Sequence, residues 1–399
     1  MARTVGTVAR GVRAPIIREG DNLPEIVAES VLACAAEEGF SLRDRDVVGV
    51  TEAIVARAQG NYASVDDIAA DIRAKFPSGE FGLIFPILSR NRFSVCLKGI
   101  LKGAKKVTLM LSYPSDEVGN ELVSLDKLDE KGVNPYSDVL TEARFRELFG
   151  VVLHPFTGMD YIGYYRTLAE ELGTELEIIL ANDARVILPY TDQVLCADIH
   201  SRARSKRLLE AAGARRVYTL DDVLKEPLNG SGFNPDYGLL GSNKATETTV
   251  KLFPRDCHPF VLEVQRILYE RTGKHIEVMV YGDGAFKDPV GKIWELADPC
   301  VSPAFTDGLF GTPNEVKLKY IADNDFAGLS GDALREAVTG YIASKSADLK
   351  DSMTAMGTTP RRLTDLIGSL CDLTSGSGDK GTPIILIQGY FDNYSSEQK

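Results

Sequence analysis

An aspartate flanked by two glycines follows a short apolar strand in the second half of the chain. Val278 and Val280 belong to this strand, and Gly282-Asp283-Gly284 ends it. Carboxylates just beyond strand ends in α/β sheets face the ligand crevice, and flanking glycines let a phosphate or metal approach the backbone closely. Mg²⁺ prefers one or two such carboxylates together with nucleotide phosphates. The pattern therefore predicts Asp283 as a metal ligand in a catalytic site, with a simple Asp/Gly turn as the alternative.

A second candidate is the glycine-rich loop Ser375-Gly-Ser-Gly-Asp-Lys-Gly381 near the C-terminus. Its unobstructed backbone N–H groups could surround a phosphate, and Lys380 could reach the same group. The loop is not a Walker A sequence, because its lysine precedes the last glycine instead of following it. A flexible connection to the next strand is the alternative interpretation.

A third candidate is a pair of arginines at a predicted helix start. Thr359 as the cap and Pro360 at the first helical position mark the N-terminus. Arg361 and Arg362 would then oppose the helix dipole, at a cost of about 0.3–1 kcal/mol each. A bound anion, from a nucleotide or an acidic substrate, would offset that cost. Local pairing with Asp365 is the alternative.

Other basic residues carry less weight. Arg202, Arg204, Lys206 and Arg207 follow His200 on a predicted helix, and Arg90 and Arg92 follow a predicted strand. These groups could hold an acidic substrate, but charge runs are usually solvated faces. The four histidines show no HExxH spacing, and no GxSxG motif is present, so the motifs of zinc peptidases and serine hydrolases are missing.

Composition narrows the class of protein further. The 399 residues carry a net charge of −12, which argues against nucleic acid as a partner, since its phosphates require a basic face. The N-terminus has no apolar run of signal-peptide length, and no stretch approaches the roughly 18–20 apolar residues of a membrane span. The six cysteines lie far apart without a CxxC pair. These features favour a cytoplasmic protein that does not bind membranes.

The elements that must position these residues alternate along the chain. Apolar strands are predicted at 47–51, 83–88, 107–111, 177–180, 193–197, 276–281 and 384–388. Two helices are predicted to begin at the caps Asn22 and Ser64. Further helices are predicted at 54–58 and near 92–102, 141–149, 201–213, 257–272, 314–321, 331–345 and 360–370. The alternation indicates a mixed α/β fold with a partly parallel sheet. A stretch rich in Gly, Asn and Ser, 229–243, marks a domain boundary.

Several segments together resemble the coenzyme F420-0:L-glutamate ligase family. Residues 15–27 resemble the opening of that family, and 47–60 resemble its next strand and the Ser-Lys-Ala-Glu-Gly that follows. Gly241-Ser-Asn243 is similar to its Ala-Ser-Asn, Thr272–Asp283 to its Thr-Gly-Lys, strand and Thr-Asp-Thr, and the loop ending at Pro383 to its final phosphate-binding segment. The matches follow the family's order along the chain.

The resemblance implies an α+β ligase core from residues 1–60 and 231–395, with 61–230 as an inserted or divergent α/β region that could bind the acceptor. It implies a homodimeric enzyme that uses GTP, or ATP, with Mg²⁺ or Mn²⁺. Such an enzyme phosphorylates a small-molecule carboxylate acceptor, and the amine of an amino acid, glutamate in the family, then attacks the acyl phosphate.

The resemblance also assigns residues by position. Those assigned to the nucleotide are Pro15, Ile16, Ile17, Arg57, Asn243, Gly376, Ser377, Gly378, Lys380 and Gly381, with Arg57 at the place of the family's lysine. Asp283 would bind metal, and Asp283 and Arg57 would be the catalytic residues. The chain has Leu240 where the family has a further metal-binding aspartate, so Asp236 or Asp379 would have to supply that carboxylate. The alternatives are another phosphoryl- or nucleotidyl-transfer enzyme on the same scaffold, or a non-catalytic nucleotide-binding regulatory protein.

Overall fold

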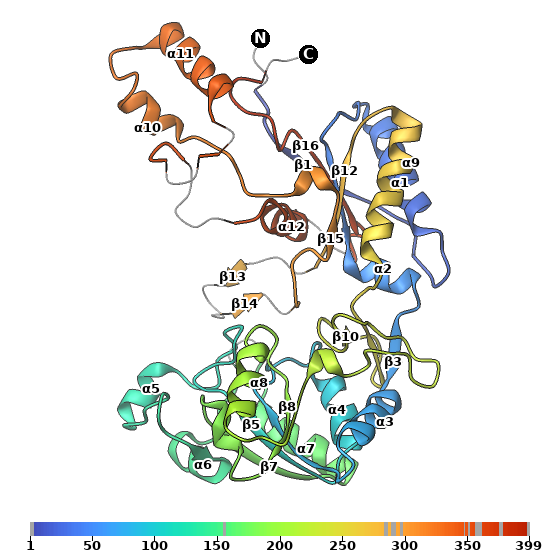
Figure 1. The fold of residues 1–399 in the computed structure, drawn as a ribbon, viewed down its shortest axis with the longest axis vertical. Helices are drawn as coiled ribbons and strands as arrows, with labels where there is room; N and C mark the ends of the chain where they lie inside the picture. The colour runs from blue at the N-terminus through green and yellow to red at the C-terminus, as the bar shows by residue number, and fades with distance from the viewer. Residues whose placement is uncertain are drawn as a thin grey trace.

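Two large β-sheets, one above the other, divide the strands of the chain (Figure 1). The computed structural model describes residues 4–154, 157–282, 286–288, 293–295, 298–346, 348–349, 352–355, 361–374 and 378–396. The architecture is mixed α/β, as expected from the alternating sequence pattern.

The first sheet has five strands in the spatial order β1-β16-β2-β12-β15. They are Val8–Val12 (β1), Val47–Thr51 (β2), Glu277–Tyr281 (β12), Ala304–Phe305 (β15) and Ile384–Gln388 (β16). β2 and β12 are parallel, and the other neighbours are antiparallel. Because β1 and β16 come from opposite ends of the sequence, their pairing brings the two termini together (Figure 1).

Helices cover both faces of this sheet. α1 (Leu23–Glu38) and α9 (Cys257–Thr272) pack together on one face, where Val31 and Val264 join a fully buried core with strand residues such as Val48. α12 (Leu363–Thr374) covers the opposite face (Figure 1). α2 (Glu52–Ala58) directly follows β2. The sheet therefore lies buried between helices, which explains why its strands read as continuous apolar runs.

The second sheet has six strands in the order β6-β7-β5-β4-β8-β9. They are Glu80–Ile84 (β4), Lys106–Leu111 (β5), Leu140–Thr141 (β6), Glu175–Leu180 (β7), Gln193–Cys196 (β8) and Arg216–Thr219 (β9). Every neighbouring pair is parallel except β6 with β7. The chain places β5 and β7 on one side of β4, and later adds β8 and β9 on the other side.

Helices also cover both faces of the six-stranded sheet. α3 (Val65–Lys75), α4 (Ser94–Lys102) and α7 (Tyr161–Leu172) share one core with the sheet. α8 (Arg202–Ala211) and the short helix Ala184–Ile187 (η1) contribute to the core on the other face. The result is a three-layer, doubly wound unit.

A small three-stranded sheet joins the two large ones. Its strands are Tyr62–Ser64 (β3), Asn243–Lys244 (β10) and Thr249–Lys251 (β11), in the order β10-β11-β3. β3 leads into the six-stranded unit, and β10 and β11 lead out of it (Figure 1). The remaining elements are α5 (Leu125–Glu130), α6 (Glu142–Phe149), α10 (Leu318–Asp323), α11 (Gly331–Ser344), the short helices Leu220–Asp222 (η2) and Asp307–Leu309 (η3), and the hairpin Phe286–Asp288 (β13) with Ile293–Glu295 (β14).

Local signals placed most of these helices correctly, although not always for the expected reason. The Ser64 cap is confirmed, because its hydroxyl accepts from Asp67 N–H and the Asp67 carboxylate accepts from Ser64 N–H. Asn22 precedes α1 but makes no side-chain cap, and Glu25 instead forms an ion pair with Arg271 of α9. The expected capping box at α1 is thus replaced by a contact between helices.

The helix predicted at 314–321 was placed too early, since α10 begins at Leu318. Val316 pairs with Ala355 in an isolated β-bridge, and Lys317 N–H donates to Thr354 O at 2.6 Å, so this backbone is extended. Among the described residues, no helix combines the length and apolarity needed to cross a membrane.

Candidate functional site

A cavity of about 710 Å³ lies where the five-stranded sheet meets the three-stranded sheet. Four segments that are far apart in the sequence line it: the turn after β1, the stretch from α2 to the start of β3, the β10–β11 hairpin, and the loop before β16. The lining residues are Ala14, Pro15, Ile16, Ile17, Ala53, Ile54, Arg57, Tyr62, Asn243, Lys244, Ala245, Thr246, Thr249, Lys251, Gly378, Gly381 and Pro383. We call this the sheet-junction cavity.

Backbone hydrogen bonds hold these segments in place. Ala14 N–H donates to Gly381 O at 3.2 Å, and Thr51 N–H donates to Pro383 O at 3.0 Å. The Arg57 guanidinium donates from Nε to the carbonyl oxygen of Ile17. The turn after β1 is therefore hydrogen-bonded both to the C-terminal loop and to α2. Segments from the two ends of the chain thus form the cavity wall together.

Two neighbouring isoleucines in this wall have opposite environments. The Ile17 side chain is only 3% exposed and belongs to the core of the five-stranded sheet, whereas Ile16 is 83% exposed at the cavity. An apolar side chain that the protein leaves in water at a cavity mouth offers a surface for a flat, partly apolar ligand group such as a nucleotide base.

Three cationic side chains line the cavity: Arg57, Lys244 and Lys251. Lys251 lies deepest, and its Nζ donates to both carboxylate oxygens of Glu52 at 2.6 Å each. Burial raises the pKa of the Glu52 carboxyl, and the adjacent ammonium group opposes that rise. Lys251 therefore reaches the cavity as one half of a buried ion pair, whose carboxylate lies at the start of α2.

Sequence reasoning did not single out Lys251 or Glu52. The available signal was a lysine within an otherwise apolar run, Val250-Lys-Leu-Phe253, all four residues of which are buried. A charge buried within such a run needs a partner of opposite sign. That partner is 199 residues away in the sequence, so no local pattern could identify it.

The C-terminal glycine-rich loop reaches the cavity through Gly378 and Gly381. Gly381 has a φ of +65° and its N–H donates to Gly378 O at 2.9 Å, so the loop turns back beside the cavity. Asp379 and Lys380 are exposed on this turn but are not among the lining residues. Gly376 and Ser377, also predicted for this loop, lie outside the described residues.

Carboxylates gather where β2 and β12 end, because the carboxyl ends of parallel strands meet at one edge of a sheet. Glu52 follows β2, and Gly282 follows β12. A Cβ added to Gly282 would lie 2.3 Å from Oδ2 of Asp298, so this buried carboxylate packs directly against the strand end. Arg92, from the six-stranded unit, donates to Oδ1 of Asp298 at 2.7 Å. The predicted metal ligand Asp283 lies just outside the described residues.

The described carboxylates bear on whether this edge suits a divalent cation. Within the described ranges, no group of three or more His, Cys, Asp or Glu side chains converges as a metal cage. Mg²⁺ does not require one, since it is usually held by one or two carboxylates plus phosphates. Both described carboxylates at this edge already pair with a cation, since both oxygens of Glu52 accept from Lys251 and Oδ1 of Asp298 accepts from Arg92, so a divalent cation here would have to share a carboxylate with one of these side chains.

Three other predicted residues lie elsewhere. Asp236 is exposed, and its N–H donates to Asn234 Oδ1 at 2.9 Å. Arg361 and Arg362 precede α12, which begins at Leu363, so neither sits in the first turn as expected. Nη2 of Arg361 lies 3.4 Å from the Ser369 hydroxyl on α12. None of the three lines the sheet-junction cavity.

Comparisons with known proteins complete the description. A family model described as F420-0:Gamma-glutamyl ligase matches residues 11–389. A coenzyme F420:L-glutamate ligase of Methanosarcina mazei is 38% identical over 84 residues, which is 20% of this chain and 30% of that protein. A protein with the same description from Methanosarcina acetivorans is 32% identical over 84 residues, with the same coverage. The matched part thus spans about a third of the length of these curated relatives.

Proposed function

The chain belongs to the F420-0:gamma-glutamyl ligase family, and from this premise we propose that it is a nucleotide- and metal-dependent ligase that joins L-glutamate to a carboxylate acceptor. The amide bond would form through an acyl phosphate. The observation that carries the proposal is the sheet-junction cavity, which gathers cationic side chains and a glycine turn from segments far apart in the chain.

The cavity has the size and chemistry that a nucleoside triphosphate requires. Its volume of about 710 Å³ falls within the usual range for small-molecule sites. Ile16 offers an apolar surface for the base, and Asn243 at the hairpin supplies an amide for polar contacts. Arg57, Lys244 and Lys251 supply positive charge, and the turn at Gly378–Gly381 lets phosphate oxygens approach the backbone.

The proposed reaction has two steps. An oxygen of the acceptor carboxylate attacks the γ-phosphorus, the bond to the bridging oxygen breaks, and the nucleoside diphosphate leaves. The amine of glutamate then attacks the carbonyl carbon of the acyl phosphate, inorganic phosphate leaves, and the amine loses a proton. Phosphoryl transfer depends mainly on positioning and charge neutralisation, which is what the three cavity cations would provide.

Mg²⁺ or Mn²⁺, when bound, would neutralise charge on the phosphate oxygens. The carboxylates that would hold the cation are Asp283, which the resemblance assigns to the metal, and Asp298, which packs against Gly282 and would have to share its carboxylate with Arg92. Asp379, on the exposed glycine turn, is the other carboxylate near the proposed phosphates.

The proposal also divides the chain into two units. Residues 1–60 and 231–395 would form the ligase core around the five-stranded sheet, and 61–230 an inserted unit around the six-stranded sheet that binds the acceptor. The parent family suggests a homodimer, which sedimentation of the purified protein would test.

The test is phosphate release by the purified protein with Mg²⁺ or Mn²⁺, GTP or ATP, glutamate and a metabolite extract, followed by mass spectrometry. The expected product is a metabolite heavier by one glutamyl residue, formed only when all components are present. Pyrophosphate release, or a phosphorylated product without an amide bond, would instead indicate another phosphoryl- or nucleotidyl-transfer enzyme. Nucleotide binding without any turnover would contradict the ligase proposal and favour a regulatory protein.

A further inference from the structure

The six-stranded unit has a switch point between β4 and β8. From β4 the chain builds outward through β5 to β7, and it then returns to build β8 and β9 on the other side. In doubly wound sheets of this kind, ligands bind outside the carboxyl ends of the strands where the order reverses. The residues directly after β8 at this point are Ala197–Ser201, followed by α8.

Three consecutive backbone N–H groups directly before α8, the last of them that of the N-cap Ser201, already hold an anionic group. Those of Ile199, His200 and Ser201 all donate to the Glu117 carboxylate, the latter two at 3.0 and 3.2 Å, and the Ser201 hydroxyl lies 3.3 Å from it. Helix N-termini bind anions because free N–H groups and the helix dipole point the same way. Glu117 belongs to the loop after β5, so its contact with α8 crosses the switch point.

Asp198 provides a second, independent observation at the same place. Its side chain is completely buried, and Oδ2 accepts from the hydroxyls of Ser201 and Ser205 at 2.7 Å each. Its other oxygen, Oδ1, is buried without a hydrogen-bond partner among the described residues. Buried polar atoms almost always have partners, so an unpaired one beside a helix N-terminus indicates a place for a ligand, an ordered water or a proton.

Asp198 suits a neighbouring anion in its protonated form only, because an ionised carboxylate would repel the anion. Burial raises the pKa of the Asp198 carboxyl, and the nearby Glu117 charge raises it further, whereas the two serine hydroxyls lower it. A protonated Asp198 would carry a hydroxyl hydrogen that an anionic oxygen can accept. The unpaired atom would then be a donor for a ligand at the same N-terminus as the three N–H groups.

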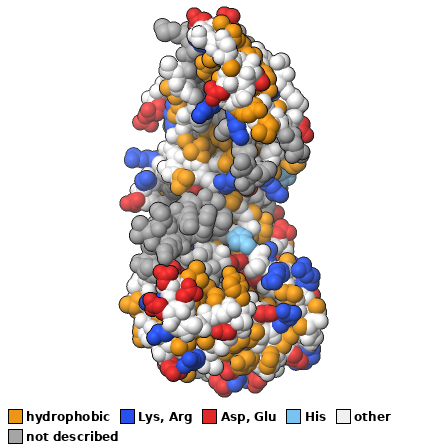
Figure 2. Space-filling view, turned by 90° about the vertical axis from the view of Figure 1, so that its left-hand side faces the viewer, with side chains coloured by type: hydrophobic (Ala, Val, Ile, Leu, Met, Phe, Trp, Pro, Cys, Tyr) orange, Lys and Arg blue, Asp and Glu red, His pale blue; other side chains and the backbone are white. Residues whose placement is uncertain are grey.

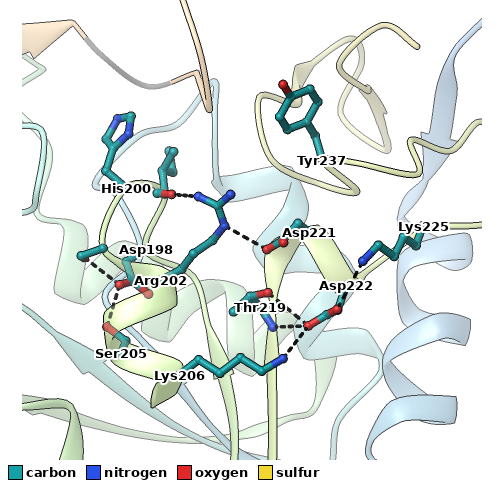
Figure 3. Close-up of polar contacts among 12 residues, drawn as sticks. Asp198, His200, Arg202, Ser205, Lys206, Thr219, Asp221, Asp222, Lys225 and Tyr237 are labelled. Atoms are coloured by element: carbon teal, nitrogen blue, oxygen red, sulfur yellow. Dashed lines mark hydrogen bonds and ion pairs between the residues drawn. The ribbon is translucent and has the colours of Figure 1, made fainter. Parts of the chain in front are cut away.

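Most of the charged side chains around the start of α8 form ion pairs with one another (Figure 3). Arg202 of α8 donates to Asp221 at 3.0 Å, and Lys206 and Lys225 both approach Asp222. The His200 side chain points away from this network (Figure 3). On the lower part of the molecule, Figure 2 shows Lys and Arg side chains interspersed with Asp and Glu side chains. Affinity for an anion would therefore come from the α8 N-terminus rather than from the surface charge.

The switch point is connected to the sheet-junction cavity. Ile199 lines a small cavity of about 20 Å³ together with Arg92 and the segment Leu239–Ser242. The next residues along the chain, Asn243 and Lys244, line the sheet-junction cavity, and Lys244 N–H donates to Asn91 O at 2.6 Å. A ligand at the α8 N-terminus would therefore lie one short segment away from the proposed nucleotide.

We propose that the N–H groups of Ile199, His200 and Ser201, together with Asp198, form a binding site for an anionic oxygen group of a small molecule, and that Glu117 occupies this site in the ligand-free protein. The anionic group is a carboxylate or a phosphate ester, and its arrival displaces Glu117. The site stands on its own geometry; its assignment to the acceptor of the ligase reaction rests on the proposed function.

The test uses the full chain labelled with ¹⁵N-histidine, which gives amide signals from only four residues. Inorganic phosphate and acetate are titrated separately, without nucleotide, against sodium chloride at matched ionic strength. We expect the His200 amide to shift saturably with phosphate or acetate, and those of His258 and His275 to stay in place. The stronger of the two anions identifies the ligand as a phosphate ester or a carboxylate.

Removing the internal competitor should strengthen binding. Glu117→Ala is expected to raise the affinity for the responding anion by on the order of tenfold, because the site no longer has to be vacated. Glu226→Ala, which removes an exposed glutamate of the same unit, controls for the change in net charge. If Glu117→Ala does not fold, the isosteric Glu117→Gln should show a smaller increase in the same direction.

Two results would overturn the inference. One is a His200 amide that responds to neither anion, or only as it responds to chloride. The other is an unchanged affinity in the folded Glu117 variant. Because no nucleotide is present, either result leaves the ligase proposal standing, and a lack of turnover in the ligase assay leaves this site standing.

Discussion

Nζ of Lys251 lies 2.6 Å from each carboxylate oxygen of Glu52, and both side chains are more than nine-tenths buried. Lys251 of this pair lines the sheet-junction cavity, and the pair joins the three-stranded sheet to the start of α2. It shows how a residue of the candidate site depends on a contact between distant segments.

Breaking this pair should destabilise the protein strongly. Lys251→Met leaves the Glu52 carboxylate buried without its counter-ion, and we expect a loss of about 3–5 kcal/mol in the free energy of unfolding. Urea denaturation at neutral pH measures it. The control is Lys244→Met, whose partner Glu247 is 74% exposed, and which should cost no more than about 1 kcal/mol. Equal urea denaturation midpoints for the two variants would show that the buried pair contributes no more to stability than the exposed pair.

The exposed isoleucine should matter for binding but not for folding. Ile16→Ser is expected to leave the melting temperature unchanged and to weaken nucleotide binding by about tenfold, because ligand contact would bury an apolar side chain. Isothermal titration with GTP and with ATP measures the affinity. Phe310→Ser, at a residue 81% exposed and away from the cavity, is the matched control. If the Ile16 variant binds nucleotide as tightly as the wild type does, the base does not contact this wall of the cavity.

Lys380 tests the glycine turn. If its ammonium group reaches a nucleotide phosphate, Lys380→Ala should lower nucleotide affinity by about tenfold at low salt. The difference should narrow as salt rises, since Lys380 is exposed and its charge is screened. Lys131→Ala, an exposed lysine on the six-stranded unit, should show no such difference. A loss that is independent of salt would point to a packing role for Lys380.

Asp116 should make stability depend on pH. Burial raises the pKa of its carboxyl to about 6, although it accepts hydrogen bonds from Leu88, Val118 and Asn120. The folded state therefore holds a proton that the unfolded state, with a pKa of 3.8, has already released. This contribution to stability is complete below pH 3.8 and is lost as pH rises through about 6.

The corresponding measurement is urea denaturation between pH 4 and 7. The contribution of Asp116 to the unfolding free energy should fall by about 2 kcal/mol over that range, taken as the difference between wild type and Asp116→Asn. The variant is less stable at every pH, because its amide nitrogen faces backbone donors. A constant difference between the two proteins across the range would contradict the raised pKa.

Much of the local structure was predictable because its causes are local. The helix predicted at 257–272 has those bounds in the structure, and strands β2 and β16 lie at the predicted residues. Apolar periodicity and caps act over a few residues, so they are legible in a single sequence. Local signals misplaced α10, where a bridge between Val316 and Ala355 keeps the backbone extended.

The candidate site was predictable only in part. The resemblance named Pro15, Ile16, Ile17, Arg57, Asn243, Gly378 and Gly381, and these residues line one cavity. Lys244, Lys251, Glu52 and Asp298 were not named. Lys251 pairs with Glu52 199 positions away, and Asp298 with Arg92 206 positions away, and no spacing rule connects residues so far apart.

The sequence by itself determined the mixed α/β character, the bounds of the strong helices and strands, and the ordered motifs that indicate the family. These follow from short-range chemistry: backbone conformation, caps and the period of apolar residues. Only the tertiary structure decided the order of the strands, the meeting of four segments around one cavity, and the placement of Glu117 on the α8 N-terminus. Those features depend on which apolar surfaces pack together and which buried charges pair between segments that are distant in the sequence. They are therefore decided only when the whole chain folds.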